Sequence, residues 1–493
     1  MKTDDDLKEL LKIPLWENFF KISQIPRESG NEKAIAAFLK TEAFKAGAKV
    51  FSDTKGNLVI KKNIEENQKQ VVALQGHMDM VCQKSAESNH NFQKDPILPF
   101  LKTVNGKRYL QAKGTTLGAD NGYALACGLT LLNEPSLQAT SLELIFTVDE
   151  EEGLTGALNF DGGLSSADWI INLDSEEEGE FVIGCAGGKT LQATRAYNFF
   201  YLPQSQQHRY VALQIDVSGF KGGHSGVEIN KNRGNAIIFL ARLLNALPKS
   251  SYFLKSLNSV FRHNVIPSCS TAEIFLDKKY VQKFERVVKQ FQNQILKKEE
   301  GARVKVFEVE NSFCQLLVKR DQKEIIKLLA KLPYGVIALA KEDSGVVESS
   351  LNPSTIIIEE KCEVKVEISF RSLSDTKLTK IFEGIKKRFV KRGFTLEEFG
   401  AYPGWQPNYN SKLLHKMEAA WKDYFKAKPI KKVIHAGLEC GVLGQKMRGK
   451  EFISIGPDIF DVHSINESID IDSAERIYEF LVHFLALDVD SSK

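Results

Sequence analysis

Short apolar runs alternate with helical patterns at both ends of the chain, and this alternation restricts the fold more than any other feature. Near the start lie four such runs, NLVIKK, VVALQG, LELIFTVDEE and WIINLDSE, and between them NGYALACGLTLLNE has apolar residues at helical spacing. Near the end the same pattern returns in EFISIGP and SAERIYEFLVHFLALD. Apolar strands that alternate with helices predict an α/β layer with a central mixed sheet flanked by helices.

The middle of the chain, from about Lys189 to Gly400, has a different character. It contains long strands such as YVALQIDVSGF and EVKVEISFRS, and strongly charged helices such as DKKYVQKFERVVKQFQNQIL. This order of elements indicates an α+β domain. We therefore expect one α/β domain, formed by both ends of the chain, that is interrupted by an inserted α+β domain.

Composition excludes several classes of function. The 493 residues are 43% hydrophobic and 26% charged, with a formal net charge of +3, which gives no electrostatic case for binding nucleic acid or an anionic membrane. No apolar run has membrane-spanning length, and the start MKTDDDLKELLKIPLW lacks the apolar core of a signal peptide. The cysteines form no CxxC pair, which favours reduced thiols in a cytoplasmic protein. They are Cys82, Cys127, Cys185, Cys269, Cys314, Cys362 and Cys440.

The stretch QGHMDM places a histidine and an aspartate two residues apart just after an apolar strand. Residues two apart on a strand face the same side, so His77 and Asp79 are expected to point the same way. They lie at the carboxyl end of the strand, where ligands collect in open α/β sheets. The pair is interpreted as a metal ligand with its orienting carboxylate, although an HxD pair also arises by chance.

Four further polar sites follow the same logic, and each has an ordinary structural alternative. Asp120, in LGADNG, lies at the mouth of a helix and can equally be an N-cap. Residues 149–152 place four carboxylates after the strand LELIF, where they form either a solvated turn or a cation site. Asp174 ends the strand WIINL and can belong to a surface turn, and His463 can be a structural histidine.

Taken together, these residues predict a site for two divalent ions. Two histidines and several carboxylates, nearly all just past strand ends, suit ions such as zinc. A carboxylate can bridge two ions that lie roughly 3.5–4 Å apart, as in two-metal hydrolases. A further glutamate that does not bind metal can then accept a proton from the attacking water.

The motifs GHMDMV, GTTLGADNGYALA, TVDEEEGLTGA, NLDSEEEGE, GGHSGVEI and GPDIFDVHS occur in this order along nearly the whole chain. They resemble the co-catalytic zinc exopeptidases with an inserted lid domain, and among these the bacterial aminoacyl-histidine dipeptidases. The resemblance implies a catalytic domain of residues 1–188 and 403–493, and a lid and dimerisation domain of residues 189–402. It also implies a homodimer with two divalent metal ions per subunit. Zinc is the expected metal, and cobalt and manganese are the alternatives.

The resemblance assigns the metal ligands residue by residue. His77 and Asp174 hold one zinc in this interpretation, and Glu151 and His463 hold the other. Asp120 bridges the two ions.

Three further features of the catalytic domain are implied by the same resemblance. Asp79 fixes the orientation and tautomer of the His77 imidazole. Glu150 is the general base, because the DEExG register that ends at Gly153 makes Glu150 the base and Glu151 the ligand. The peptide bond between Asp120 and Asn121 is expected to be cis, which is costly for a residue other than proline.

The lid supplies the remaining candidates. His224, in GGHSGVEI, is expected to donate a hydrogen bond to the developing oxyanion, and its alternative is a loop histidine without a special role. Asn264 and Arg371 are expected to bind the substrate, the guanidinium by pairing with a carboxylate. Their alternatives are a turn asparagine and an arginine in a salt bridge at a strand end. Gly437 and Glu439 are expected to meet the substrate, Glu439 at its free amino end.

The sequence therefore predicts a cytoplasmic hydrolase of dipeptides. The resemblance implies Xaa-His substrates, including β-alanyl-histidine, and activity on other dipeptides as well. Two alternatives stay open. One is a related amidohydrolase, an N-acyl-amino-acid deacylase or a tripeptide aminopeptidase, and the other is a non-catalytic metal-binding relative of the same fold.

Overall fold

The computed structural model forms two compact units. It describes residues 2–64, 70–310, 315–340, 345–359 and 363–490. The first unit comprises residues 1–185, 405–433 and 438–493, and the second comprises residues 186–404 and 434–437. The main divisions thus follow Cys185 and Gly404. No feature of the sequence indicates that the short segment 434–437 belongs to the second unit.

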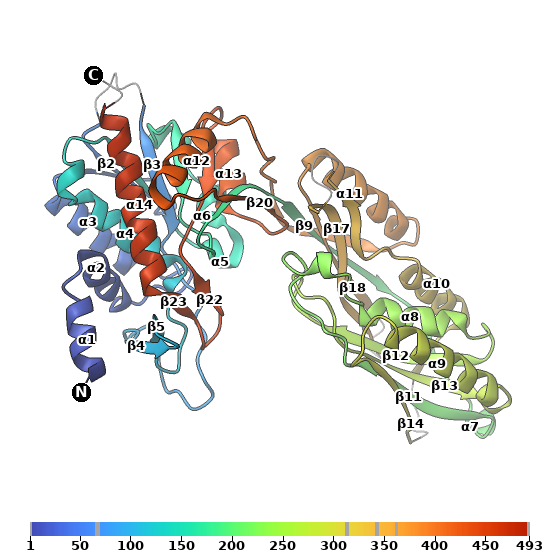
Figure 1. Ribbon diagram of the computed structural model, residues 1–493. Coiled ribbons are helices and arrows are strands. Elements are labelled where there is room, and N and C mark those ends of the chain that lie inside the picture. Colours follow the sequence, from blue (N-terminus) through green and yellow to red (C-terminus); the bar gives the residue numbers. More distant parts are fainter. Residues whose placement is uncertain (1, 65–69, 311–314, 341–344, 360–362, 491–493) are drawn as a thin grey trace. The chain divides into compact units, whose positions relative to one another are not determined.

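An eight-stranded sheet forms the centre of the first unit (Figure 1). In spatial order its strands are β1 (Lys49–Ser52), β2 (Leu58–Lys62), β6 (Leu142–Thr147), β3 (Val72–His77), β7 (Trp169–Asn172), β21 (Glu451–Ser454), β8 (Glu180–Cys185) and β20 (Ile430–Ile434). The four strands β6, β3, β7 and β21 are parallel, whereas β1, β2 and β8 pair in antiparallel fashion. The predicted mixed sheet is therefore confirmed.

Helices cover both faces of this sheet (Figure 1). The main hydrophobic core lies between the sheet and five helices, α2 (Pro14–Ser23), α3 (Lys33–Lys45), α4 (Ala119–Leu132), α12 (Lys412–Phe425) and α14 (Ile471–Asp490). Helix α2 shows why they form: Pro14 occupies its first turn, and Trp16, Phe19 and Ile22 recur at helical spacing and are buried. On the other face, α6 (Thr155–Leu158) packs against α13 (Glu439–Lys446).

Helix α13 forms in a segment whose sequence does not favour a helix. The glycine-rich segment ECGVLGQK has low intrinsic helix propensity, because glycine costs about 1 kcal/mol in a helix relative to alanine. Burial of Cys440, Val442 and Leu443 overrides that preference.

Smaller elements complete the first unit. They are the helices α1 (Lys2–Leu10) and α5 (Glu150–Gly153), and the four-stranded sheet of β22 (Ile459–Phe460), β23 (Ser468–Asp470), β5 (Lys107–Ala112) and β4 (Pro99–Val104).

The second unit contains a nine-stranded sheet, and the strand pairs described within it are antiparallel. In spatial order the strands are β14 (Arg303–Glu308), β11 (Tyr210–Ser218), β13 (Ser270–Asp277), β12 (Tyr252–Val260), β17 (Val347–Ile358), β18 (Glu363–Ser372), β9 (Gly187–Ala196) and β19 (Thr395–Tyr402), with β16 (Gly335–Leu339) beside β17. A short pair, β10 (Phe199–Tyr201) and β15 (Gln315–Leu317), lies apart from it.

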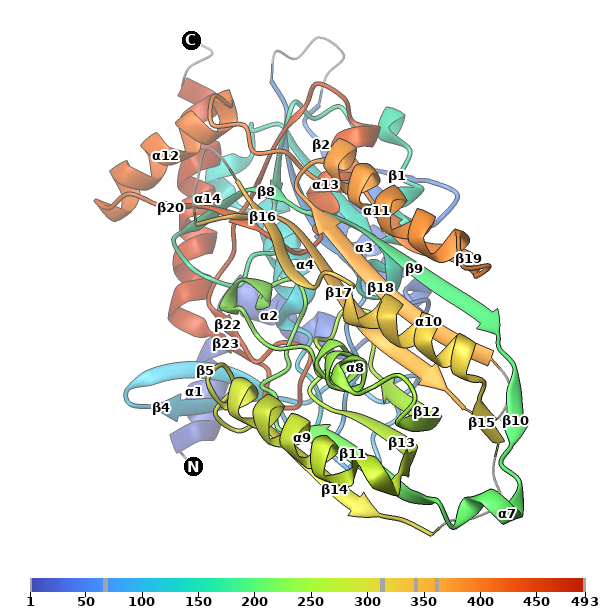
Figure 2. The ribbon, with the colours of Figure 1, turned by 90° about the vertical axis from the view of Figure 1, so that its right-hand side faces the viewer.

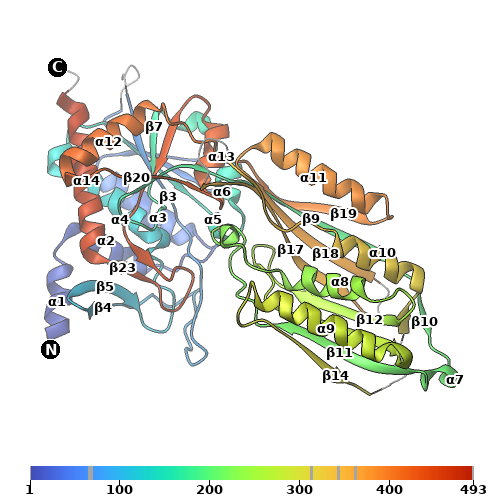
Figure 3. The same cartoon turned by 45° about the vertical axis from the view of Figure 1, so that its right-hand side comes forward.

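Four helices pack on this second sheet (Figures 2 and 3). They are α8 (Ala236–Ala246), α9 (Val281–Leu296), α10 (Lys319–Ala330) and α11 (Asp375–Val390), and a short helix α7 (Gln204–Gln207) precedes β11. Burial alternates along β11, where Ile215 and Val217 join the core and Gln214 and Asp216 do not. This alternation is typical of an antiparallel sheet with one covered face, so the inserted α+β character is confirmed.

Two sequence expectations concern the chain as a whole. Among the described residues, five of the seven cysteines are present and none forms a disulfide, whereas Cys314 and Cys362 lie outside the described residues. Within the described ranges, no helix is both long enough and apolar enough to cross a membrane.

Candidate metal centre

The parallel strands of the first unit deliver polar side chains to one edge of the sheet. His77 is the last residue of β3, directly beside Thr147 at the end of β6. Helix α5, with Glu150 and Glu151, follows β6, and Asp174 follows β7, the other neighbour of β3. Because these strands are parallel, their carboxyl ends meet at the same edge, as the sequence pattern predicts.

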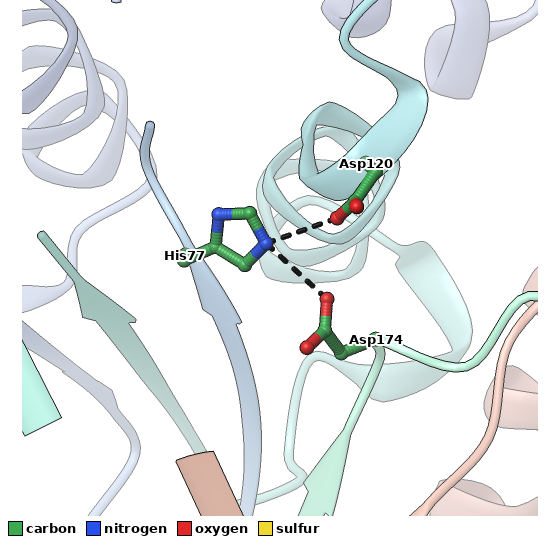
Figure 4. A group of neighbouring side chains, drawn as sticks. All are labelled: His77, Asp120 and Asp174. Atoms are coloured by element: carbon green, nitrogen blue, oxygen red, sulfur yellow. Dashed lines mark hydrogen bonds and ion pairs between the residues drawn. The ribbon is translucent and has the colours of Figure 1, made fainter. Parts of the chain in front are cut away.

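His77 lies at the centre of this group and is buried. Its Nε2 is 3.0 Å from Oδ1 of Asp120 and 3.2 Å from Oδ1 of Asp174 (Figure 4). Its other ring nitrogen, Nδ1, lies 3.3 Å from Oδ1 of Asp79. One ring nitrogen therefore faces two carboxylates, and the other faces the carboxylate that was expected to orient the ring.

Asp79 is fixed by hydrogen bonds to both of its carboxylate oxygens. Oδ1 accepts the Glu150 backbone N–H at 3.1 Å, and Oδ2 accepts the Ser29 hydroxyl at 2.8 Å and the Glu151 N–H at 3.2 Å. Burial alone would raise the pKa of Asp79, but its bonds with His77, Ser29 and Glu150 lower the pKa to about 2. Ser29 is a contributor that the sequence did not point to.

Asp120 links two groups of potential ligands. Its Oδ1 faces His77, and its Oδ2 lies 3.2 Å from Nε2 of His463. The same His463 nitrogen is 3.1 Å from Oε2 of Glu151. The bond between Asp120 and Asn121 is cis. The Asn121 side chain donates a hydrogen bond to Asp174 at 2.9 Å.

The five expected ligands therefore form two clusters that share one carboxylate. One cluster is His77, Asp120 and Asp174, and the other is Asp120, Glu151 and His463; in each, one potential ligand atom from every residue lies within 4.8 Å of the others. Glu150 joins His77 and Glu151 in a further cluster of the same kind.

Because these carboxylates lie close together, the group favours the binding of a cation. Burial raises the pKa of Glu150 well above its usual value, and the charges of Asp174 and Glu151 raise it further, against the effect of His77. Burial also raises the pKa of Glu151, as does the charge of Asp120. Burial lowers the pKa of His463, but hydrogen bonds to Asp120 and Glu151 raise it to about 11. A bound cation would relieve this accumulation of negative charge.

The residues present fit a pair of divalent ions. Imidazole nitrogens and carboxylate oxygens are the donors that zinc, cobalt and manganese accept in proteins. Within the described part of the chain, the buried Oε1 of Glu151 has no hydrogen-bond partner, which leaves it available to a ligand.

His224 belongs to the second unit and has a defined orientation. Its Nδ1 accepts the backbone N–H groups of Gly226 and Val227, both at 3.2 Å. A neutral ring that accepts at Nδ1 carries its proton on Nε2, so Nε2 is the donor. Gly226 is required here, because a Cβ at this position would come within 2.9 Å of the His435 carbonyl oxygen.

The other expected substrate-binding residues of the second unit have buried polar atoms without partners. Asn264 accepts the Ser225 N–H through its backbone carbonyl at 2.7 Å, but its Oδ1 has no partner among the described residues. Arg371 is buried and donates through Nη1 to the Tyr402 hydroxyl at 2.6 Å, and its Nε is likewise without a described partner. Gly437 packs against Tyr402, where a Cβ would approach the ring to 2.7 Å.

His435 was not predicted and belongs to the same part of the second unit. Its Nε2 is 2.8 Å from the hydroxyl of Ser350, which lies opposite Arg371 in the β17–β18 pairing. Burial and the charge of Arg371 lower the pKa of His435 to about 3, so the ring is neutral. In the sequence, the only indication of a role for His435 is its position two residues before Gly437, an expected substrate contact.

Glu439 uses one of its two carboxylate oxygens within the first unit. Its side chain is fully buried, and its Oε2 accepts hydrogen bonds from the Gln75 amide at 2.5 Å and the Thr147 hydroxyl at 2.6 Å. This oxygen therefore supports the ends of β3 and β6, whereas the buried Oε1 of Glu439 has no hydrogen-bond partner among the described residues.

Comparison with known proteins agrees with this architecture. The model of peptidase family M20/M25/M40 matches residues 73–487. The chain is 34% identical over 488 residues to cytosol non-specific dipeptidase of Escherichia coli, a match that covers 97% of this chain and 98% of the relative.

Solved structures show the same likeness. Aminoacylhistidine dipeptidase from Vibrio alginolyticus is 33% identical, with 96% of each chain covered and a TM-score of 0.83. Aminopeptidase PepT from Bacillus cereus is 16% identical, with 96% of this chain and 97% of that chain covered and a TM-score of 0.55, so it shares the fold. The family model and the full-length relative lead to one conclusion: the chain belongs to peptidase family M20/M25/M40.

Proposed function

We propose that this protein is a metal-dependent dipeptidase. The observation that carries the proposal is the pair of ligand clusters that share Asp120, at the carboxyl edge of the parallel strands. Support comes from the two full-length relatives, which are named cytosol non-specific dipeptidase and aminoacylhistidine dipeptidase. The name of the first relative also supports a cytoplasmic location.

In this proposal the protein binds two divalent ions, and zinc is the preferred candidate. His77 and Asp174 would hold one ion, Glu151 and His463 would hold the other, and Asp120 would be a ligand shared by both. Such ions lower the pKa of bound water and polarise the scissile carbonyl.

The chain's own residues perform the proton transfers. Glu150 accepts a proton from the attacking water and then delivers it to the leaving amine. Burial raises the pKa of Glu150 above its usual value, which favours the acceptance of a proton by this carboxylate. Asp79 keeps the His77 ring in one orientation, with its Nε2 toward Asp120 and Asp174.

We assign the binding of the substrate to groups of the second unit. His224 donates from Nε2 to the oxyanion of the tetrahedral intermediate, a role that its acceptor Nδ1 supports. Arg371 and Asn264 bind the substrate carboxylate and amide. Each has a buried polar atom that lacks a partner among the described residues, which supports this assignment. The expected substrates are dipeptides, with Xaa-His compounds such as β-alanyl-histidine among them. The second unit is also the proposed dimerisation domain of a homodimer.

The test compares four substrates: β-alanyl-histidine, leucyl-glycine, an N-acetyl amino acid and a tripeptide. Each is assayed with the purified protein, after treatment with a chelator, and after zinc is returned. Cleavage of the dipeptides that disappears with chelation and returns with zinc supports the proposal. Cleavage of the acetylated compound or the tripeptide alone would move the protein to the deacylases or tripeptide aminopeptidases. Absence of all hydrolysis with zinc bound would contradict a dipeptidase.

A further inference from the structure

Two buried charged residues, Arg27 and Glu467, bond to the backbone of the segments that carry the proposed ligands. Each is only 3% exposed, and neither belongs to the ligand clusters. Buried charges are costly unless they are paired and hydrogen-bonded, so their partners indicate what they do.

Glu467 binds the turn that carries Asp120. Its Oε2 accepts the N–H groups of Leu117 and Gly118 at 2.8 and 2.9 Å, and its Oε1 accepts those of Ala119 and Asp120 at 2.7 and 3.3 Å. The backbone of Asp120 and Asn121 is not helical, so these four N–H groups belong to a turn that precedes the regular part of α4. Glu467 therefore supplies, from a distant segment, the acceptor that these buried N–H groups need.

Glu467 itself directly follows the loop that carries His463. Residues 461–466 are exposed or half-buried, and the His463 side chain is 48% exposed. His463 also has a φ of +61°, which an L-residue rarely adopts. Glu467, four residues later, is the buried anchor of this loop. It thus ties the His463 segment to the Asp120 turn, and the side chains of His463 and Asp120 meet at 3.2 Å.

Arg27 connects the same turn to the segment of His77 and Asp79. Its Nη1 donates to the carbonyl oxygens of Met78 at 3.1 Å and Asp79 at 2.8 Å, and its Nη2 donates to that of Gly118. Its charge interacts with those of Glu467 and Asp79. A Cβ on Gly118 would come within 2.5 Å of Nη2, so the close approach requires glycine.

We infer that Glu467 is a positioning residue that sets the metal affinity of the cluster of Asp120, Glu151 and His463, with Arg27 as its buried counter-charge. This inference rests on the proposed function, because it assumes that this cluster binds a metal ion. Without the carboxylate, four N–H groups lose their acceptor and the His463 loop loses its anchor. The pair of His77 and Asp174 keeps its own supports, so it is affected only through the shared Asp120.

The test is Glu467→Gln, which keeps the size of the side chain but leaves one acceptor oxygen for four donors. Zinc binding is measured by equilibrium dialysis with metal analysis and by competition with a chromophoric chelator. The wild type is expected to bind two zinc ions per chain. In the variant, one of the two sites is expected to lose about 10- to 100-fold in affinity, the effect typical of residues that orient metal ligands, while the other changes little.

A matched control separates positioning from general loosening. Glu143 is another fully buried glutamate of the first unit, and it accepts the Ser166 N–H at 2.9 Å and the Ser165 hydroxyl. Glu143→Gln is expected to lower the melting temperature and to leave both zinc affinities unchanged. If Glu143→Gln weakens zinc binding as much as Glu467→Gln, or if Glu467→Gln binds both ions normally, the inference is wrong.

A second measurement covers the case in which Glu467→Gln does not fold. In metal-free wild-type protein, the amides of residues 117–120 are expected to exchange slowly with deuterium, because Glu467 holds them without any ion. Rapid exchange there would overturn the inference. A wild type that binds no zinc would instead refute the proposed function, so the two failures are distinguishable.

Discussion

Replacement of Asp79 by asparagine tests how far the metal site depends on the group that orients His77. Each carboxylate oxygen of Asp79 faces two donors: Oδ1 faces the His77 ring and the Glu150 N–H, and Oδ2 faces the Ser29 hydroxyl and the Glu151 N–H. Asparagine has one acceptor oxygen, so its NH₂ group must face two of the four donors.

The expected magnitude follows from these contacts. Each of the two lost hydrogen bonds is worth about 0.5–1.5 kcal/mol, so the combined cost is about 1–3 kcal/mol. At about 1.4 kcal/mol per tenfold change, this corresponds to roughly a 5- to 150-fold loss of zinc affinity if the cost falls on the His77 position. The substitution is also expected to lower the stability of the fold, because a buried donor without an acceptor is destabilising.

The assay is zinc competition with a chromophoric chelator, run beside thermal unfolding of the metal-free protein. Ser29→Ala is the graded control, because it removes one donor and keeps the charge of Asp79, and it is expected to cause a smaller loss. Wild-type zinc affinity in a folded Asp79→Asn protein would refute the orienting role.

Three further predictions concern catalysis and pH. Glu150→Gln is expected to keep both zinc ions and to lower kcat by about 10²–10⁴-fold, and near-normal kcat would assign the base elsewhere. His224→Ala is expected to lower kcat by about 10²–10³-fold with a smaller rise in KM, since an oxyanion contact strengthens in the transition state; a change in KM alone would make it a ground-state contact. The lowered pKa of Asp79, about 2 against an ordinary 3.8, stabilises the fold above pH 4, and this stability is lost as pH falls toward 2. In chelator, the difference in unfolding free energy between wild type and Asp79→Asn should therefore shrink from pH 5 to pH 2, and a constant difference would contradict it.

The sequence predicted the parts of the fold that depend on local patterns. Apolar strands that end in polar residues are visible in the sequence itself. This pattern places His77, residues 150–152, Asp174 and His463 just past strand ends, and Asp120 at the start of a helix. The fold class followed from the same alternation. The roles of these residues as ligands came from the family resemblance and remain proposals.

Features that depend on tertiary contacts were beyond the sequence. Helix α13 formed against its propensity because burial of Val442 and Leu443 compensates for the glycines. Glu467 and Arg27 act through backbone N–H and carbonyl groups, which nearly every residue possesses, so no motif marks them. The hydrogen bonds of Glu439 Oε2 with Gln75 and Thr147 join residues that lie far apart in the sequence, so no local pattern predicts them.

The central claim is that two ions share Asp120, and anomalous diffraction from zinc-loaded crystals tests it most directly. The account predicts two peaks roughly 3.5–4 Å apart, one beside His77 and Asp174 and the other beside Glu151 and His463, with the Asp120 carboxylate between them. A single peak, or two peaks without Asp120 between them, would contradict it.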